Sequence, residues 1–341
     1  MIKNYQYLRI LSLITIFSLL IVGCSHENEI DPEEVESILP YDSSKHIYGV
    51  FGVNNGDKWE VVIDPVTGKL DRIPETKEIF GGVSGYIGSK DLTSFDRNER
   101  IYIPTADDTK LILQNLDNFE ITTIDLTDMS LNKTVVFPKL IRFGKDQNEI
   151  YLLDTDDSLW KIDLDSQVVT RVHDRIPVSD NKAIFNFFYI ESTGNFLCNI
   201  KGDGENDKLI IFNPQAPNSS AFITTNYIAS GFGFVQHPID RDKFYYIQRL
   251  SNNKGYRLMY VEVVEDQIFV SQKSVADLPI ENLSTYLQTI HSATNTYILR
   301  AGSNNIDSPS NNLYSINLNT GVLVNEVDLK EVGFISKLAG E

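Results

Sequence analysis

One pattern of hydrophobic and polar positions recurs along the chain about every fifty residues. Each copy holds a hydrophobic residue, a polar turn, a hydrophobic strand, an acidic turn and a further strand, most clearly in residues 95–113 and 143–164. Between residues 47 and 297 the five intervals average 50 residues. The strand that follows the polar turn has one anchor residue in each copy, and these six anchors are Ile47, Ile101, Ile150, Phe196, Phe244 and Tyr297.

Each copy then continues through a tight turn into another strand. Asn, Asp and Gly, which suit the positive-φ positions of short hairpins, occupy these turns. The clearest turns lie at residues 64–68, 116–118, 163–166, 265–266 and 317–321. A fifty-residue unit of four antiparallel strands without a helical period is typical of a β-propeller blade. The sequence therefore predicts an all-β fold, a single β-propeller of four-stranded antiparallel blades.

The length of the repeating region sets the number of blades. Residues 35–341 divided by a period of 50 give about six copies, so we expect six blades, with seven as the alternative. Residues 332–337 follow the last expected strand and are again apolar. We expect them to return to the first blade and close the ring by backbone hydrogen bonds, which would cover its open edge. A ring closed only by side-chain packing is the alternative.

The first residues of the chain carry an export signal. Lys3 and Arg9 precede an uncharged apolar run at residues 10–23, whose 14 residues are too few to span a membrane and suit a signal peptide. The run ends in Ile21-Val22-Gly23-Cys24, which resembles the bacterial lipobox. The resemblance implies cleavage before Cys24 and lipidation of its thiol, and two or three acyl chains anchor a protein stably. A secretory peptide with an incidental cysteine is the alternative.

These features divide the chain into a lipoprotein signal peptide at 1–23, an acidic tether at 24–34 and a β-propeller at 35–341. The acidic residues behind Cys24 resemble the surface-export signals of Bacteroidota-type lipoproteins, although a solvated spacer would have the same composition. That resemblance implies an outer-membrane protein, anchored by its N-terminal lipid and facing the cell exterior.

The repeats also resemble a known class of propellers. A hydrophobic residue, four or five turn residues and a hydrophobic pair are similar to the repeats of TolB-type six-bladed propellers and, more widely, of uncharacterised Bacteroidota propeller lipoproteins. The chain lacks the Pro-Asp-Gly turn of TolB-type sequences, and only residues 237–240 come near it. Such families capture substrates beside outer-membrane transporters, scaffold assembly or hydrolyse substrates, so the resemblance implies a fold and leaves the function open.

Charge and cysteine content restrict the function further. The chain has 30 Lys and Arg against 47 Asp and Glu, a net charge of -17, which excludes nucleic-acid binding as the main function. Once Cys24 is lipidated, Cys198 is the only cysteine left, so no intramolecular disulfide can form. We expect Cys198 to be a small buried hydrophobic residue.

The sequence contains no catalytic fingerprint and no cysteine pair for zinc, so an enzyme is not favoured and no cofactor is predicted. The acidic turns offer oxygen ligands for Ca²⁺, but none has EF-hand or RTX spacing, and solvated hairpin tips explain them. His237 and His291 fall at similar positions of the innermost strands. They would either approach each other at the channel mouth or pack between blades.

Two features suggest a ligand site. Arg142 stands on an expected innermost strand, a costly place for an unpaired cation unless it faces a wet channel or a carboxylate. A four-glycine segment at residues 80–88, which contains Tyr86, is expected to be an insertion before the second blade and to lie on the face of the acidic turns, with Arg142 deeper in the same funnel. The expected equivalents of Arg142 in the other blades are Ser94, Tyr189, Gln236 and Thr289. A hydrated channel with no ligand would show the same pattern.

The sequence as a whole predicts a membrane-anchored, surface-exposed propeller that binds a ligand or partner. A small molecule or glycan is the expected ligand, and an outer-membrane transporter for nutrient uptake is the expected partner. A glycan- or lactone-active hydrolase on a propeller scaffold is one alternative, and a periplasm-facing assembly scaffold is another.

Overall fold

The structure is a computed structural model of the whole chain. The chain divides into two units, Met1–Pro40 and Tyr41–Glu341, and only the second contains residues that the structure describes. The signal peptide, Cys24, the tether and the expected boundary at residue 35 lie outside them. Within the described part of the chain, no helix is long and apolar enough to cross a membrane. The described residues are 46–52, 58–73, 83–88, 99–104, 109–115, 118, 120–136, 138–176, 182–202, 207–216, 222–228, 231–250, 255–272, 285–302, 312–329 and 334–339.

The strands of the first half of the chain, together with β26 from its end, form three four-stranded sheets. The first sheet contains β26 (Phe334–Ala339), β1 (Ile47–Gly52), β2 (Lys58–Ile63) and β3 (Leu70–Ile73). The second contains β4 (Val83–Gly88), β5 (Glu99–Pro104), β6 (Lys110–Asn115) and β7 (Ile121–Asp125). The third contains β10 (Pro138–Phe143), β11 (Glu149–Asp154), β12 (Leu159–Asp163) and β13 (Val168–His173).

Three more four-stranded sheets follow in the second half. The fourth contains β14 (Lys182–Tyr189), β15 (Phe196–Gly202), β16 (Asp207–Phe212) and β17 (Phe222–Ile228). The fifth contains β18 (Gly231–Gln236), β19 (Lys243–Arg249), β20 (Tyr256–Val264) and β21 (Gln267–Gln272). The sixth contains β22 (Thr285–His291), β23 (Thr296–Gly302), β24 (Asn312–Asn317) and β25 (Leu323–Asp328). A two-stranded hairpin, β8 (Thr127–Asp128) and β9 (Lys133–Thr134), lies between the second and third sheets in sequence.

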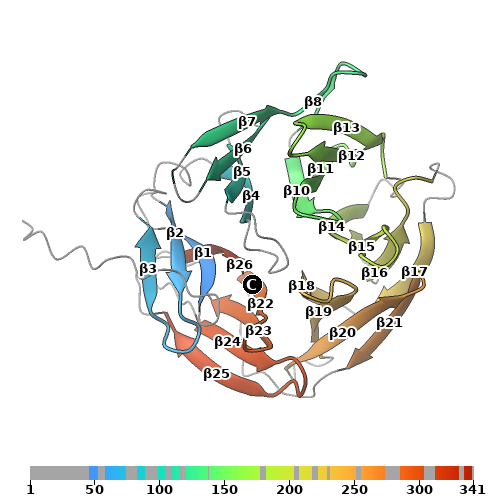
Figure 1. Cartoon of the computed structure of the whole chain (residues 1–341). Helices are drawn as coiled ribbons and strands as arrows, with labels where there is room; N and C mark the ends of the chain where they lie inside the picture. The colour runs from blue at the N-terminus through green and yellow to red at the C-terminus, as the bar shows by residue number, and fades with distance from the viewer. Residues whose placement is uncertain are drawn as a thin grey trace, which may run out of the picture. The chain divides into compact units, whose positions relative to one another are not determined.

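The sheets of residues 41–341 follow one another around a ring, and the first strand of each lies nearest the ring's centre (Figure 1). Neighbouring strands within each sheet are antiparallel, and innermost strands of adjacent sheets contact one another, as β4 does β10 and β18 does β22. The predicted class, an all-β propeller of four-stranded antiparallel blades, is confirmed. Because strand directions alternate within a sheet, the hairpins after the first and third strands lie on one face and those after the second strand on the other.

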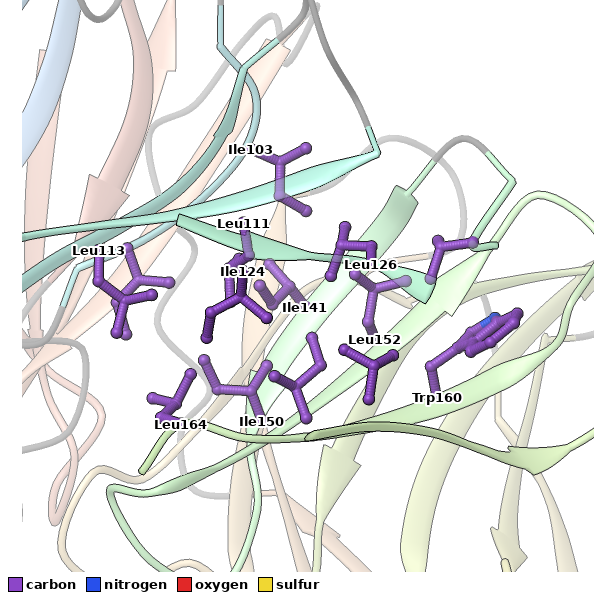
Figure 2. Close-up of a cluster of buried hydrophobic side chains, with 14 of the residues drawn as sticks. Ile103, Leu111, Leu113, Ile124, Leu126, Ile141, Ile150, Leu152, Trp160 and Leu164 are labelled. Carbon is purple, nitrogen blue, oxygen red and sulfur yellow. The ribbon is translucent and has the colours of Figure 1, made fainter. Parts of the chain in front are cut away.

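The core of this unit lies between sheets. Hydrophobic residues of neighbouring sheets form five buried clusters, which join the second sheet to the third and continue pairwise around to the sixth and first. Figure 2 shows the cluster in which Ile103 and Leu111 of the second sheet meet Ile141, Leu152 and Trp160 of the third. Each sheet is covered only by its neighbours, as expected when a lone four-stranded sheet leaves both faces exposed.

Turn chemistry explains where the third strand ends in the first and fifth sheets. In the β2–β3 hairpin the Asp64 carboxylate accepts hydrogen bonds from Val66 N at 2.8 Å and Thr67 N at 3.2 Å, and Gly68 has a φ of +75°. Between β20 and β21, Glu265 and Asp266 have φ values of +48° and +58°. A two-residue hairpin needs this left-handed conformation at both central residues. The turns predicted at 64–68, 163–166, 265–266 and 317–321 are confirmed, whereas residues 116 and 117 of the predicted turn at 116–118 lie outside the described residues.

The two ends of the propeller meet in one sheet. β26, from the end of the chain, pairs antiparallel with β1, with Gly49 opposite Leu338 and Gly52 opposite Phe334. β26 thereby supplies the innermost strand of the first sheet. The expected return of the last segment is confirmed, with the strand at 334–339 rather than 332–337.

The glycine-rich segment corrects one expectation. Val83–Gly88 is not an insertion before the second blade but its innermost strand, β4, with Tyr86 opposite Tyr102. The sequence misled because glycine is depleted from strands, yet backbone pairing needs no side chain. The pairing of β4 with β5 shifts register between Val83 and Gly85. Glycine suits such an irregular position because it has no Cβ. Ser94, the expected equivalent of Arg142 in this blade, lies outside the described residues.

Cys198 matches its prediction. It lies on β15, is fully buried and is a free thiol within the cluster joining the third and fourth sheets. Burial raises the pKa of the thiol, so it stays protonated and unreactive at neutral pH.

Removing residues 332–341 tests the closing strand. The truncation exposes the hydrogen-bonding edge of β1 and uncovers the first sheet, so the free energy of unfolding should fall by roughly 3–5 kcal/mol, a large share of a domain's stability. Urea denaturation measures this change, and deletion of residues 340–341, beyond β26, is the matched control. An unchanged midpoint for the longer truncation would show that side-chain packing alone closes the ring.

Candidate functional site

The predicted polar ring combines two registers of the innermost strands. Arg142 lies opposite Tyr151, the residue after an anchor, and Tyr86 and Thr289 occupy this same register in their sheets. Tyr189 lies opposite the anchor Phe196 itself, and Gln236 opposite Phe244. A shift of one residue turns a side chain to the other face of its sheet, so these residues do not form one ring. The residues that share the register of Arg142 in the other five sheets are Tyr86, Phe188, Val235, Thr289 and Ala339.

Arg142 does not lie where the sequence predicted. β10 begins on the face of the acidic second-to-third-strand turns and ends on the other, so Arg142, its penultimate residue, is close to the opposite face. Its Nη1 donates to Ile141 O at 2.8 Å, and its guanidinium lies 5.2 Å from the centre of the Phe188 ring in the next sheet. The side chain is half-buried and packs between sheets. Thr289 is buried, and the side chain of Tyr86 lies outside the described set.

Tyr189 and Gln236 belong to a cluster that ties three sheets together on that opposite face. Gln236 Nε2 donates to Tyr189 O at 2.5 Å and to Arg241 O at 2.6 Å. The Arg241 guanidinium is buried, donates to Phe143 O at 3.1 Å and lies 5.4 Å from the Tyr189 ring centre. The cluster therefore joins the first hairpins of the third, fourth and fifth sheets. Sequence reasoning missed Arg241, because a cation in a polar turn gives no sign that it reaches a hairpin about a hundred residues away.

Burial shifts the ionisation of this cluster. Burial raises the pKa of the Tyr189 phenol, and the negative charge of Glu149 raises it further. Burial also lowers the pKa of Arg241, which Glu191 and other nearby acidic groups partly offset. Gln236, Tyr189 and Arg241 contact one another and the backbone of neighbouring sheets. These contacts hold the three sheets together.

His237, which directly follows β18, and His291, the last residue of β22, each close their own hairpin. His237 Nδ1 accepts a hydrogen bond from Asp240 N at 2.9 Å, and His291 Nδ1 lies 2.7 Å from Thr294 Oγ1. Among the described residues no group of three His, Cys, Asp or Glu side chains is placed to hold a metal ion.

An open cleft lies at the outer edge of the third sheet, where sequence reasoning predicted no site. Its volume is about 540 Å³, within the range of small-molecule sites. A second cleft of about 380 Å³ adjoins it and shares Asp174. The first cleft is lined by Leu131, Arg171, Val172, His173, Asp174, Pro214, Gln215 and Ala216. The second is lined by Thr155, Asp156, Asp157, Asp174 and Arg175.

The charged groups of the larger cleft, Arg171 and Asp174, pair with each other and leave little net charge. Arg171 Nη1 lies 2.7 Å from Asp174 Oδ1, and Arg171 Nη2 donates to Ser158 Oγ at 2.7 Å. His173 is 93% buried, since its exposed fraction is 7%, and its ring meets Phe212 of the fourth sheet edge-on at 5.1 Å. Within the described part of the chain neither ring nitrogen of His173 has a hydrogen-bond partner. Such an uncompensated group costs stability and calls for an explanation.

The β8–β9 hairpin forms one wall of the cleft, and Asp128 holds it there. Asp128 Oδ2 accepts from Arg171 N at 2.9 Å, while its Oδ1 accepts from Ser130 N at 2.9 Å and Leu131 N at 3.2 Å. The hydrogen bond from Arg171 N, followed by that from the Ser130 hydroxyl, lowers the pKa of this carboxyl below its usual 3.8. The ionised carboxylate thus fixes Leu131 beside β13, where Leu131 lines the cleft.

Comparison with known proteins adds only the fold. No family model matches the sequence. No curated protein matches it at a significant level. The β-propeller domain of Cps50 (Swd1) from Myceliophteria thermophila is similar in structure, with a TM-score of 0.50 and 12% identity over 83% of this chain and 87% of that one.

Two further structures are similar at lower scores. A candidate 6-phosphogluconolactonase from Bacteroides uniformis has a TM-score of 0.45 and 10% identity, over 86% of this chain and 98% of that one. An oligogalacturonate lyase from Vibrio parahaemolyticus has a TM-score of 0.42 and 11% identity, over 83% of this chain and 73% of that one. The similarity to the Cps50 domain defines this chain as a β-propeller.

Asp128→Asn tests the attachment of the hairpin. Because the folded-state pKa is lowered, the carboxylate stabilises the fold above pH 3.8, and this stabilisation is lost as the pH falls through the lower folded value. The substitution should cost about 1–2 kcal/mol at pH 7, as expected for hydrogen bonds to a charged group, and progressively less at lower pH. Urea denaturation from pH 7 down to pH 3 measures it, with exposed Asp125→Asn as the control. A cost that does not change with pH would contradict the role of the ionised form.

Proposed function

We propose that this protein is a lipid-anchored, outward-facing binding protein of the outer membrane, whose six-bladed propeller presents a ligand site to the exterior. The single observation that carries the anchor is the sequence Ile21-Val22-Gly23-Cys24 at the end of a 14-residue apolar run. The acidic residues behind Cys24 support display on the cell surface, and the resemblance to Bacteroidota propeller lipoproteins and TolB-type repeats is consistent with it.

The cleft beside β13 supports the binding role better than the innermost strands do. The described polar groups of Gln236, Tyr189 and Arg241 hydrogen-bond or stack within the protein. In the cleft, by contrast, the Asp174 side chain is 75% exposed and Gln215 is exposed beside an apolar wall. Amide, carboxylate and guanidinium groups bind hydroxyl groups, and the apolar wall suits the C–H face of a sugar ring. The expected ligand is therefore a neutral, polyhydroxylated molecule of the glycan class.

The anchor is tested by Cys24→Ala. Without the thiol no lipid can be attached, so the protein should move from the membrane fraction to the soluble fraction after carbonate washing. Immunoblots of both fractions measure the change, with Cys198→Ser as the control that leaves the lipidated residue intact. A Cys24→Ala protein that still sediments with washed membranes would contradict the proposal. Added protease should degrade the wild-type protein on intact cells, and its protection there would contradict outward display.

The site is tested by calorimetry of the full chain in a detergent without sugar headgroups, with glucose, galactose, mannose, cellobiose and lactose as probes. For a sugar that binds, Gln215→Ala should weaken binding roughly fivefold to tenfold, the effect of one lost hydrogen bond. Exposed Thr170→Ala lies on the same edge strand outside the cleft and is the control. If Arg142→Ala weakens binding and Gln215→Ala does not, the site lies on the innermost strands. If no sugar binds, the ligand class is wrong.

A further inference from the structure

Exposed aliphatic side chains mark one face of the propeller. Five of the six sheets carry one at the hairpin between third and fourth strands or at the strand end beside it, and each is between 47% and 64% exposed. These five residues, called the aliphatic rim here, are Val66, Ile121, Val168, Val264 and Val322. Ile239, in the first hairpin of the fifth sheet, is 62% exposed on the same face.

Turn chemistry directs these side chains outward. In the β12–β13 hairpin, Asp163 Oδ1 accepts from Ser166 N at 2.8 Å, and in the β24–β25 hairpin, Asn317 Oδ1 accepts from Thr320 N at 3.0 Å. The polar side chains that form the turns are thus directed back to their own backbone. Val168 and Val322 follow these turns directly and are left exposed. Single exposed aliphatic residues are common, but recurrence at or beside the same hairpin in five sheets places them on one face of the propeller.

The chain enters the propeller on the same face. β1 begins at Ile47, which lies opposite Ile63, and the hairpin that holds Val66 starts at the next residue, Asp64. The segment between Cys24 and Ile47 has 22 residues, 25–46, and could reach roughly 70 Å when extended at 3.3 Å per residue. The segment that leads from Cys24 therefore joins the propeller on the face of the aliphatic rim, and not on the one with the acidic second-to-third-strand turns.

From this arrangement we propose that the aliphatic rim rests on the bilayer that holds the Cys24 lipid, an inference that depends on the proposed anchor. Separate small aliphatic side chains on one face suit shallow insertion into a lipid surface, because burial of each removes apolar area from water. The net charge of -17 opposes binding to anionic lipid, so the attraction must be apolar. The second cleft, lined by the second-to-third-strand turn at residues 155–157, lies on the opposite face and stays open to solvent.

The test uses the full lipidated chain in phosphatidylcholine vesicles, with tryptophan introduced by Val322→Trp or Val66→Trp. Brominated acyl chains should quench the added fluorescence at least twofold relative to unbrominated lipid. Val136→Trp is the control, because Val136 is 40% exposed and precedes β10 on the opposite face, where its carbonyl accepts from Thr155 N. Wild-type protein corrects for Trp59 and Trp160. Quenching should persist at high salt, since the contact is apolar.

The outcomes separate this inference from the anchor. Protein that sediments with vesicles but shows equal, weak quenching at Val322→Trp and Val136→Trp retains the anchor and overturns the docking. Stronger quenching at Val136→Trp overturns it as well, because the other face would then lie on the lipid. Protein that does not sediment with vesicles overturns both. Val66→Asp should reduce the quenching of Val322→Trp if the rim docks as a unit, and unchanged quenching would contradict this.

Discussion

The pairing of β26 with β1 is the interaction on which the propeller depends. Each sheet gains its hydrophobic stability from the sheets on either side, so a ring with an unpaired end leaves two sheets half covered. Here the last strand of the chain takes the innermost place in the first sheet, through pairs such as Gly49 with Leu338. Closure is thus achieved by backbone hydrogen bonds, which also remove an exposed strand edge.

Closure determines where polar residues can be used. The sheet faces are buried in clusters such as that of Ile141 and Trp160 (Figure 2). Polar side chains that could meet a ligand are therefore restricted to the hairpins and to the outermost strands. On one face the hairpins are tied together around Arg241, which contacts the third and fourth sheets from the fifth. The polar groups of this tie are bonded within the protein rather than directed to a ligand. The tie also accounts for the burial of Tyr189 and the half-buried state of Gln236.

The outer edge of the third sheet differs because a hairpin is added there. β8 lies beside β13, held by the carboxylate of Asp128 (Figure 1). The hairpin that β8 begins places Leu131 in the lining of the cleft. His173 lies in the lining, buried against Phe212 and without a hydrogen bond from the described residues. A polar group kept at such a cost beside an open cleft is consistent with a binding role.

The sequence by itself determined the repeat, the four strands of each unit and the return of the last segment. It also located hairpins between third and fourth strands. These features follow from alternation and turn residues, which are local signals. The sequence also predicted the burial of Cys198. It misplaced the glycine-rich strand β4, because backbone pairing leaves no trace in side chains. Only the tertiary structure decided the register of Tyr189 and Gln236 relative to Arg142, since hairpin length fixes register and a one-residue slip reverses the side chains. The tie through Arg241 and the cleft at His173 likewise join distant segments, and no local pattern encodes such contacts.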